Sequence, residues 1–252
     1  MILEKPFLDY IPKRIVSLVP SQTELLFDLG LEDETVGITK FCVHPNEWFR
    51  NKTRVGGTKT VHIDKVRFLQ PDLIIANKEE NVKEQVEVLS DIAPTWVSDI
   101  QTLDDALSMI NHIGLLTRKE QEALKIIALI EEGFNTITNL KSSHHKALYL
   151  IWHKPWMSIG KDTFINDMLQ KIGCDNVFAN LNRYPELTDE AIKDSGTNLV
   201  LLSSEPYPFK EKHIALIQEL LPEASIKLVD GEMFSWYGSR LIKAPSYFKS
   251  LF

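Results

Sequence analysis

Short apolar runs alternate with amphipathic segments along the first half of the chain. The runs are four to six residues long and rich in β-branched side chains, which is typical of strands buried on both faces of a parallel sheet. Ser21 with Glu24 has the spacing of a capping box, and Gly30 suits a helix end. The pattern predicts strands at 14–19, 35–39, 73–76 and 94–97 and helices at 21–30, 64–70, 81–90 and 103–116.

The longest helical pattern lies in the middle of the chain. Its apolar positions step by three or four residues from Ala123 to Leu140, and Thr117 with Glu120 has the spacing of a second capping box. This predicts a helix of roughly 23 residues, about 35 Å long at 1.5 Å per residue. We expect it to be the only continuous connection between two α/β halves. A single α/β domain with one long helix is the alternative.

The pattern of the first half returns after this helix. It predicts strands at 147–152, 198–203 and 226–229 and helices at 163–172, 209–221 and from about 238 onward, with Thr188 capping a short helix. The predicted fold class is therefore α/β, with two lobes built on mainly parallel sheets and joined by one long backbone helix. The predicted boundaries are 1–117 for the first lobe, 118–141 for the helix and 142–252 for the second lobe.

Two similar strands carry a glutamate at the same position in each half. The segment DLIIANKE, which ends at Glu79, aligns with NLVLLSSE, which ends at Glu205. Both glutamates should leave the carboxyl edge of equivalent strands, which is where open α/β sheets place their binding loops. Eight residues are weak evidence for duplication, and two solvated surface acids are the alternative reading.

Composition excludes several classes of function. The chain has 252 residues with 28 basic and 35 acidic side chains, for a net charge of −7, and it lacks the basic patch of a nucleic-acid-binding protein. No stretch approaches the length of a membrane span, and no signal peptide opens the sequence. The sequence as it stands predicts a cytoplasmic protein that is not inserted in a membrane. The two cysteines, Cys42 and Cys174, are expected to be free thiols.

Aromatic side chains are the main candidates for ligand binding. All five tryptophans lie in or beside loops at predicted strand ends, which together suggests an aromatic cleft between the halves, although each alone could be a packing residue. His44 and His153 lie in the same loops and could coordinate a metal carried by a ligand. No spacing typical of a zinc site or of a nucleophile elbow occurs. No catalytic residue, resident metal or intrinsic cofactor is therefore predicted.

Four segments resemble the class III substrate-binding proteins of ABC importers, and the cobalamin-binding branch is the most similar. They are KRIVSLVPSQTELLFDLGL, VGITKFCVHP, VGGTKTVHIDKVRFLQPDLIIA and SIGKDTFINDMLQKIGCDNVF. The resemblance implies a monomer that binds vitamin B12, haem or a ferric siderophore between two α/β lobes. It also implies an ABC transporter permease as partner.

The resemblance also assigns roles to individual residues. It implies permease docking by Glu79 (or Glu80) and by Glu205, so that reversal of both charges should abolish docking and leave ligand affinity unchanged. It implies ligand contacts by aromatic side chains of both halves and by polar groups near the C-terminus, namely Phe41 or Trp48, Trp96, Trp152, His153, Trp156, Glu232, Trp236 and Arg240.

The absence of an export signal leaves three functions open. The first is the binding component of an importer, which would be periplasmic if a leader has been removed. The second is a cytosolic carrier of corrinoids or tetrapyrroles that has no permease. The third is a hydrolase or chelatase on the same scaffold, although the sequence favours a protein that is not an enzyme.

Overall fold

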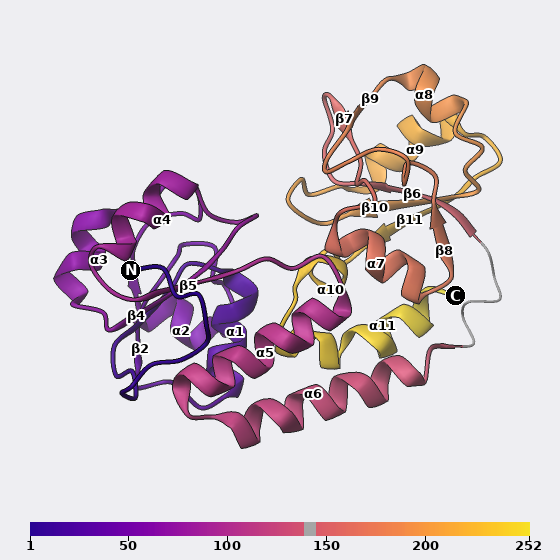
Figure 1. Cartoon of the computed structure of the whole chain (residues 1–252). Helices are drawn as coiled ribbons and strands as arrows, with labels where there is room; N and C mark the ends of the chain where they lie inside the picture. The colour runs from indigo at the N-terminus through magenta and orange to yellow at the C-terminus, as the bar shows by residue number, and fades with distance from the viewer. Residues whose placement is uncertain (139–144) are drawn as a thin grey trace. The chain divides into compact units, whose positions relative to one another are not determined.

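A computed structural model describes residues 1–138 and 145–252 of the chain (Figure 1). These residues form two compact units. The first comprises Met1–Ile100, Asp104–Ile130 and Trp236–Arg240, and the second comprises Gln101–Leu103, Glu131–Ser235 and Leu241–Phe252. The first unit thus includes five residues from near the C-terminus. That one helix is the only continuous connection stays a prediction. The predicted domain limits stay a prediction, and the limit at 141/142 lies outside the described residues.

The first unit is built on a five-stranded parallel sheet. Its strand order is β3-β2-β1-β4-β5. The strands are β1 (Ile15–Ser17), β2 (Thr35–Ile38), β3 (Thr53–Arg54), β4 (Leu73–Asn77) and β5 (Thr95–Ser98). The helices are α1 (Pro20–Asp28), α2 (Asn46–Asn51), α3 (Ile63–Leu69), α4 (Lys83–Ser90), α5 (Leu103–Thr117) and the first part of α6 (Glu120–Asn135).

Apolar side chains explain why helices pack on this sheet. Val16 and Leu18 of the β1 region pack in one buried cluster with Ile74 and Ala76 of β4. Side chains of α3 and α4 complete that cluster, namely Val66, Leu69, Val86 and Leu89. Alternating residues of a strand point to opposite faces, so Ile15 and Ile75, which are also fully buried, belong to the other face. A sheet buried on both faces produces the continuous apolar runs of the sequence.

The second unit contains a four-stranded parallel sheet with the order β11-β10-β6-β8 and a small antiparallel pair, β7-β9. The strands are β6 (His145–Leu150), β7 (Trp156–Met157), β8 (Cys174–Asn176), β9 (Glu186–Leu187), β10 (Leu199–Ser203) and β11 (Ser225–Val229). The helices are α7 (Phe164–Lys171), α8 (Asp189–Lys193), α9 (Glu211–Leu220), α10 (Glu232–Ser235) and α11 (Ala244–Leu251), with a 3₁₀ turn at Ser239–Ile242.

The two sheets share one strand plan. The order β2-β1-β4-β5 in the first unit corresponds to β8-β6-β10-β11 in the second. Backbone hydrogen bonds just beyond the strands agree with this correspondence. The amide of Lys78 donates to the carbonyl of Ser98 at 2.9 Å, and the amide of Ser204 donates to the carbonyl of Val229 at 2.9 Å. β4 and β10, which carry the aligned segments, therefore occupy equivalent places.

The middle of the chain departs from the predicted long helix. Thr117 ends α5 and does not cap α6, because its hydroxyl donates back to the carbonyl of Ile113 at 2.7 Å. Arg118 then turns the chain with a φ of 57°. A Cβ on Gly114 would lie 2.6 Å from the Cβ of Ala123, so the two helices approach closely at this point. α6 is shorter than predicted, and the predicted end at Leu140 lies outside the described residues.

The other predicted helix starts and caps were confirmed only in part. α1 begins at Pro20, one residue before the predicted cap, and its first turn has no side-chain cap. Thr163 and Thr188 do cap α7 and α8, each accepting an amide hydrogen bond. Both cysteines are free, as predicted, and both are buried. Six short elements were missed because none carries a full period of apolar side chains: α2, β3, β7, β8, β9 and α10.

Candidate functional site

A buried ion pair anchors the C-terminal segment Trp236–Arg240 to the first unit. The guanidinium of Arg240 donates from Nε and from Nη2 to the two carboxylate oxygens of Glu24, each at 2.8 Å. Both residues are only 7% exposed. A bidentate pair of this kind fixes orientation as well as distance. Glu24, which the capping-box pattern had placed at a helix start, is therefore the anchor of a segment 216 positions away.

The ion pair orients two aromatic rings of the first unit. The Arg240 guanidinium lies over the Trp236 ring at 4.7 Å, and the His44 ring meets Trp236 edge-on at 5.5 Å. Gly238 makes this approach possible, because it has a φ of 153° and a Cβ there would lie 2.9 Å from the carbonyl oxygen of Ser21. The segment thus contacts α1 at Gly238 and at Arg240.

The remaining predicted aromatics of this unit differ in exposure. Trp48 is fully buried in α2, where its ring meets Phe27 edge-on at 5.5 Å. Phe41 is 50% exposed and lies under the ammonium of Lys40. Of the two residues considered for the same role, Phe41 is the one with a ring open to a ligand. Trp96 is buried in β5.

A polar network shapes the turn that carries Glu79. The side-chain oxygen of Asn77 accepts from the amides of Glu79 and Glu80, at 2.8 and 3.2 Å. Asn77 also donates to Ser98, and the amide of Asn77 donates to the side chain of Asn81. Burial raises the pKa of Glu80, and nearby Lys59 opposes that rise. Since every one of these bonds involves the carboxyl end of β4 or β5, the turn is fixed to the sheet.

In the second unit, loops after β6 and β10 bring together an aromatic cluster. We define the cluster by its six rings: Trp152, His153, Trp156, Tyr207, Phe209 and His213. Ring centroids lie 4.4 Å apart for His153 and Trp156, and Trp156 stacks on Phe209 at 6.4 Å with an interplanar angle of 7°. Trp152 meets Tyr207 edge-on at 5.5 Å and is itself 39% exposed. The cluster gives the carboxyl edge of this sheet an aromatic surface.

His213 is a buried member of this cluster, and its ring contacts those of His153, Tyr207 and Phe209. Its Nδ1 accepts from the amide of Lys210 at 2.9 Å, so that Nε2 carries the proton donated to the Tyr207 hydroxyl at 3.1 Å. Burial lowers the pKa of His213, and the charge of Lys212 lowers it further. Burial likewise lowers the pKa of His153, together with His213 and two lysines. Both imidazoles are therefore neutral at neutral pH.

Glu205 follows β10 as Glu79 follows β4. The amide of Glu79 donates to the side chain of the last residue of its strand, Asn77, and the amide of Glu205 donates to the hydroxyl of the last residue of its strand, Ser203, at 3.3 Å. The carboxylate of Glu205 accepts from the hydroxyl of Ser235 at 2.5 Å. The predicted ligand residue Glu232 lies in the same turn as Ser235, partly buried, with its amide donating to Asp230.

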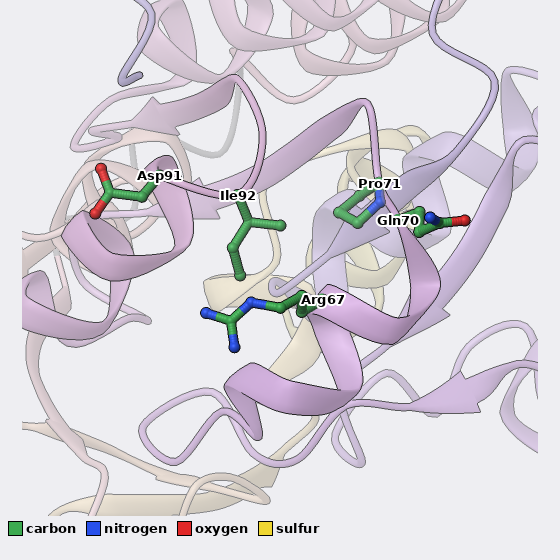
Figure 2. Close-up of a pocket in the computed structure, with 5 residues that line it drawn as sticks. All are labelled: Arg67, Gln70, Pro71, Asp91 and Ile92. Carbon is green, nitrogen blue, oxygen red and sulfur yellow. The ribbon is translucent and has the colours of Figure 1, made fainter.

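A surface hollow of about 390 Å³ lies at the opposite edge of the first sheet (Figure 2). It is lined by Arg67 and Gln70 at the end of α3, by Pro71 before β4, and by Asp91 and Ile92 after α4. These positions precede strands β4 and β5, whereas the loops described above follow strands. The hollow contains none of the predicted site residues, and open α/β sheets bind ligands at the other edge.

The described residues also bear on metal sites and membrane spans. Across 1–138 and 145–252, no group of three or more His, Cys, Asp or Glu side chains could hold a metal ion. Within the same ranges, no helix is long and apolar enough to cross a membrane.

Sequence reasoning missed several residues of these sites. Tyr207, Phe209 and His213 were read only as part of a loop and a helix, although the YPF segment beside a second histidine could have drawn attention to them. Nothing local indicates the partners of Glu24 and Ser235, because these partners, Arg240 and Glu205, are far away in the sequence.

The periplasmic binding protein family matches residues 15–221. The chain belongs to that family. This confirms the resemblance seen in the sequence. An uncharacterized ABC transporter substrate-binding lipoprotein of Bacillus subtilis, YvrC, is 31% identical over 191 residues, which are 72% of this chain and 60% of that relative. The match thus spans less than two thirds of the lipoprotein's length.

Solved structures confirm the fold of two α/β lobes. The periplasmic vitamin B12 binding protein BtuF of Vibrio cholerae superposes with a TM-score of 0.81 at 21% identity, covering 95% of this chain and 97% of that one. The periplasmic heme binding protein HutB of Vibrio cholerae superposes with a TM-score of 0.80 at 21% identity, covering 94% and 98%. At this identity the likeness establishes the fold and leaves the ligand to be argued.

The neutral histidines predict how stability depends on pH. A histidine whose folded pKa lies below its unfolded value, about 6.5, takes up a proton more readily when unfolded. We therefore expect the free energy of unfolding to fall as pH drops below about 6.5, and to level off once the folded protein also takes up the proton. Chemical denaturation at a series of pH values measures this.

Substitution of His213 tests whether this histidine causes the pH dependence of stability. His213→Gln should flatten the pH dependence, whereas His62→Gln, at an exposed histidine, should leave it as it is. An equally steep fall in both variants would show that the aromatic cluster does not hold His213 neutral.

Proposed function

We propose that this protein captures a metal chelate, a cobalamin-like corrinoid, haem or a ferric siderophore, as the substrate-binding component of an ABC importer. Membership of the periplasmic binding protein family supports a binding role. The observation that carries the ligand class is the aromatic cluster at the carboxyl edge of the second sheet. The relatives named above are binding proteins, and we propose no catalytic activity.

The aromatic groups suit a broad, flat ligand. A corrinoid or tetrapyrrole has an apolar face with polar edges, which calls for aromatic walls and a few polar groups that fix orientation. Trp152 and Phe41 each offer a partly exposed ring. His44 and Trp236 add a second aromatic pair in the first unit. The ligand contacts proposed for Trp96 and Trp156 rest on their position at strand ends.

Arg240 contributes to this site through Trp236. Its guanidinium is bound to Glu24, and the face of the same group covers the Trp236 ring. We therefore assign Arg240 the role of positioning Trp236.

The equivalent glutamates support the importer context. Glu79 and Glu205 each stand two residues beyond the end of a five-residue buried strand, with their amides held by the side chain that ends the strand. Two acids presented in the same way by two similar units form a matched pair of contacts for a partner with two similar halves. Such charges contribute mainly to specificity and association rate.

Ligand titration tests the proposed ligand class. We expect cobalamin, cobinamide, haem or a ferric siderophore to quench the tryptophan fluorescence saturably, with a dissociation constant that is micromolar or lower. Trp152→Ala and Phe41→Ala should each weaken binding about three- to tenfold, because a stacked ring is worth roughly 0.5–1.5 kcal/mol beyond the area it buries. The matched control is Phe68→Ala, which removes a ring that is 85% exposed on α3.

The same titration can refute the proposal. Linear quenching by every chelate, as absorption of the excitation light alone produces, would remove the metal-chelate class. Equal loss of affinity in Phe68→Ala would show that the chosen rings have no special role.

Charge reversal tests the importer context. Glu79→Lys and Glu205→Lys should each weaken binding to the permease at least tenfold in a pull-down with the reconstituted transporter, because each places a cation where the partner must accept an anion. Glu190→Lys, at an exposed glutamate of α8, should not. Full binding by the double variant would contradict docking through these residues and would favour a carrier without a permease.

A further inference from the structure

Three lysines adjoin the aromatic cluster of the second unit. Lys154 follows His153 directly, and Lys210 and Lys212 lie at the start of α9 beside His213. Lys210 is fixed to the cluster through its backbone. Its amide donates to Nδ1 of His213 at 2.9 Å, and its carbonyl accepts from the amide of His213 at 2.8 Å. All three lysines are exposed, and together they form what we call the cationic rim: Lys154, Lys210 and Lys212.

The charges of the cationic rim act on both imidazoles of the cluster. Burial lowers the pKa of His153 most, followed by His213, Lys154 and Lys212. Burial also lowers the pKa of His213 most, followed by the charge of Lys212, and the charge of Lys210 acts in the same direction. A nearby cation has this effect because it disfavours a second positive charge. The three ammonium groups therefore lie close enough to act on the rings of the cluster.

No other part of the described chain engages these ammonium groups. Within residues 1–138 and 145–252, none of the three forms an ion pair with a carboxylate, and none lies over an aromatic ring. Asp189 and Glu211 are acids beside the cluster, and Asp189 accepts a hydrogen bond from the indole of Trp156 at 2.8 Å. An anionic group held against the rings would therefore meet ammonium groups that are free to bind it.

The backbone at Lys154 has a conformation that does not favour lysine. Its φ is 67°, which lies in the left-handed region that glycine and asparagine adopt with least strain. Strain of this kind is typical of functional sites. The local backbone therefore does not explain a lysine at this position, whereas an anionic ligand of the cluster does.

We infer that the chelate bound at the aromatic cluster carries anionic groups at its edge, which the cationic rim binds while the ring system of the ligand stacks on Trp152. The inference rests on the proposed function and narrows its ligand class. It favours a chelate with carboxylate groups, such as haem, over a corrinoid whose edge carries neutral amides. Ammonium groups beside an apolar surface attract anions more strongly than fully solvated ones, because less water screens the charges.

A matched pair of dyes tests the cationic rim without any chelate. The anionic dye 8-anilinonaphthalene-1-sulfonate and the neutral dye N-phenyl-1-naphthylamine share one aromatic skeleton and differ by a sulfonate group. We expect the anionic dye to bind about fivefold more tightly, the upper end for one exposed charge pair. The double variant with Lys154→Asn and Lys212→Met should lose this preference. Asparagine is chosen because it tolerates the positive φ.

The control for both substitutions is a lysine at the other edge of the same sheet. Lys146→Met removes an exposed lysine near the start of β6 and should leave the preference between the dyes unchanged. Equal binding of the two dyes by the unmodified protein would overturn the inference. So would a preference that survives the double substitution, or one that Lys146→Met removes equally well.

Haem and its dimethyl ester test the ligand class. They share the metal and the ring system and differ only in whether the carboxylates are esterified. Haem should bind about tenfold more tightly than the ester, and this ratio should shrink in the double variant and at high salt, because salt screens exposed charges. Equal affinity for haem and its ester, or tighter binding of cobalamin than of haem, would overturn the inference. Absence of saturable binding by every chelate would instead refute the proposed function, and the dye preference would still decide whether the rim binds anions.

Discussion

The buried pair between Glu24 and Arg240 is the interaction on which the rest of the site depends. Moving two charges out of water is costly, and the cost is recovered only when the geometry is close to ideal. Here both carboxylate oxygens are engaged at 2.8 Å, and the flat face of the guanidinium also covers Trp236. The pair therefore selects one placement for Trp236–Arg240. That placement in turn fixes Trp236 and His44, although neither residue takes part in the ion pair.

The shared strand plan explains where function can be placed. The central strands of each sheet, such as β4 and β10, are buried along their whole length. The loops beyond the carboxyl ends of the strands are therefore the places available for binding. In the first unit those loops carry Phe41, His44 and the Glu79 turn. In the second unit they carry the aromatic cluster and Glu205. The two units use one scaffold and have acquired different side chains at corresponding edges.

Local pattern was sufficient to predict most of the fold. Strands such as β4 and β10 are continuous apolar runs, and helices such as α7 carry both a capping threonine and an apolar stripe, so each is specified by residues that are neighbours in the sequence. The aligned glutamates were found for the same reason. α6 begins within two residues of its predicted start, but the assignment of Thr117 as its cap was wrong, because the turn at Arg118 has a positive φ that leaves no trace in the pattern of apolar residues.

The candidate site was only partly predictable, because its key contacts join distant residues. In the sequence Glu24 fits the pattern of a capping box. Only the fold shows that its carboxylate binds an arginine 216 positions away. Trp48 and Trp152 look alike in sequence, since both lie near strand ends, yet one is fully buried and the other is partly exposed. Burial of a single aromatic ring depends on what the fold packs over it, which neighbouring residues do not reveal.

A double-mutant cycle on Glu24 and Arg240 tests this account most directly. Glu24→Met and Arg240→Met should each lower the free energy of unfolding by about 3–5 kcal/mol, because each leaves one buried charge without its partner. The double variant, which buries no charge, should lose much less than the sum of the two. Losses that simply add, or single variants as stable as the unmodified protein, would contradict the claim that this pair holds the site together.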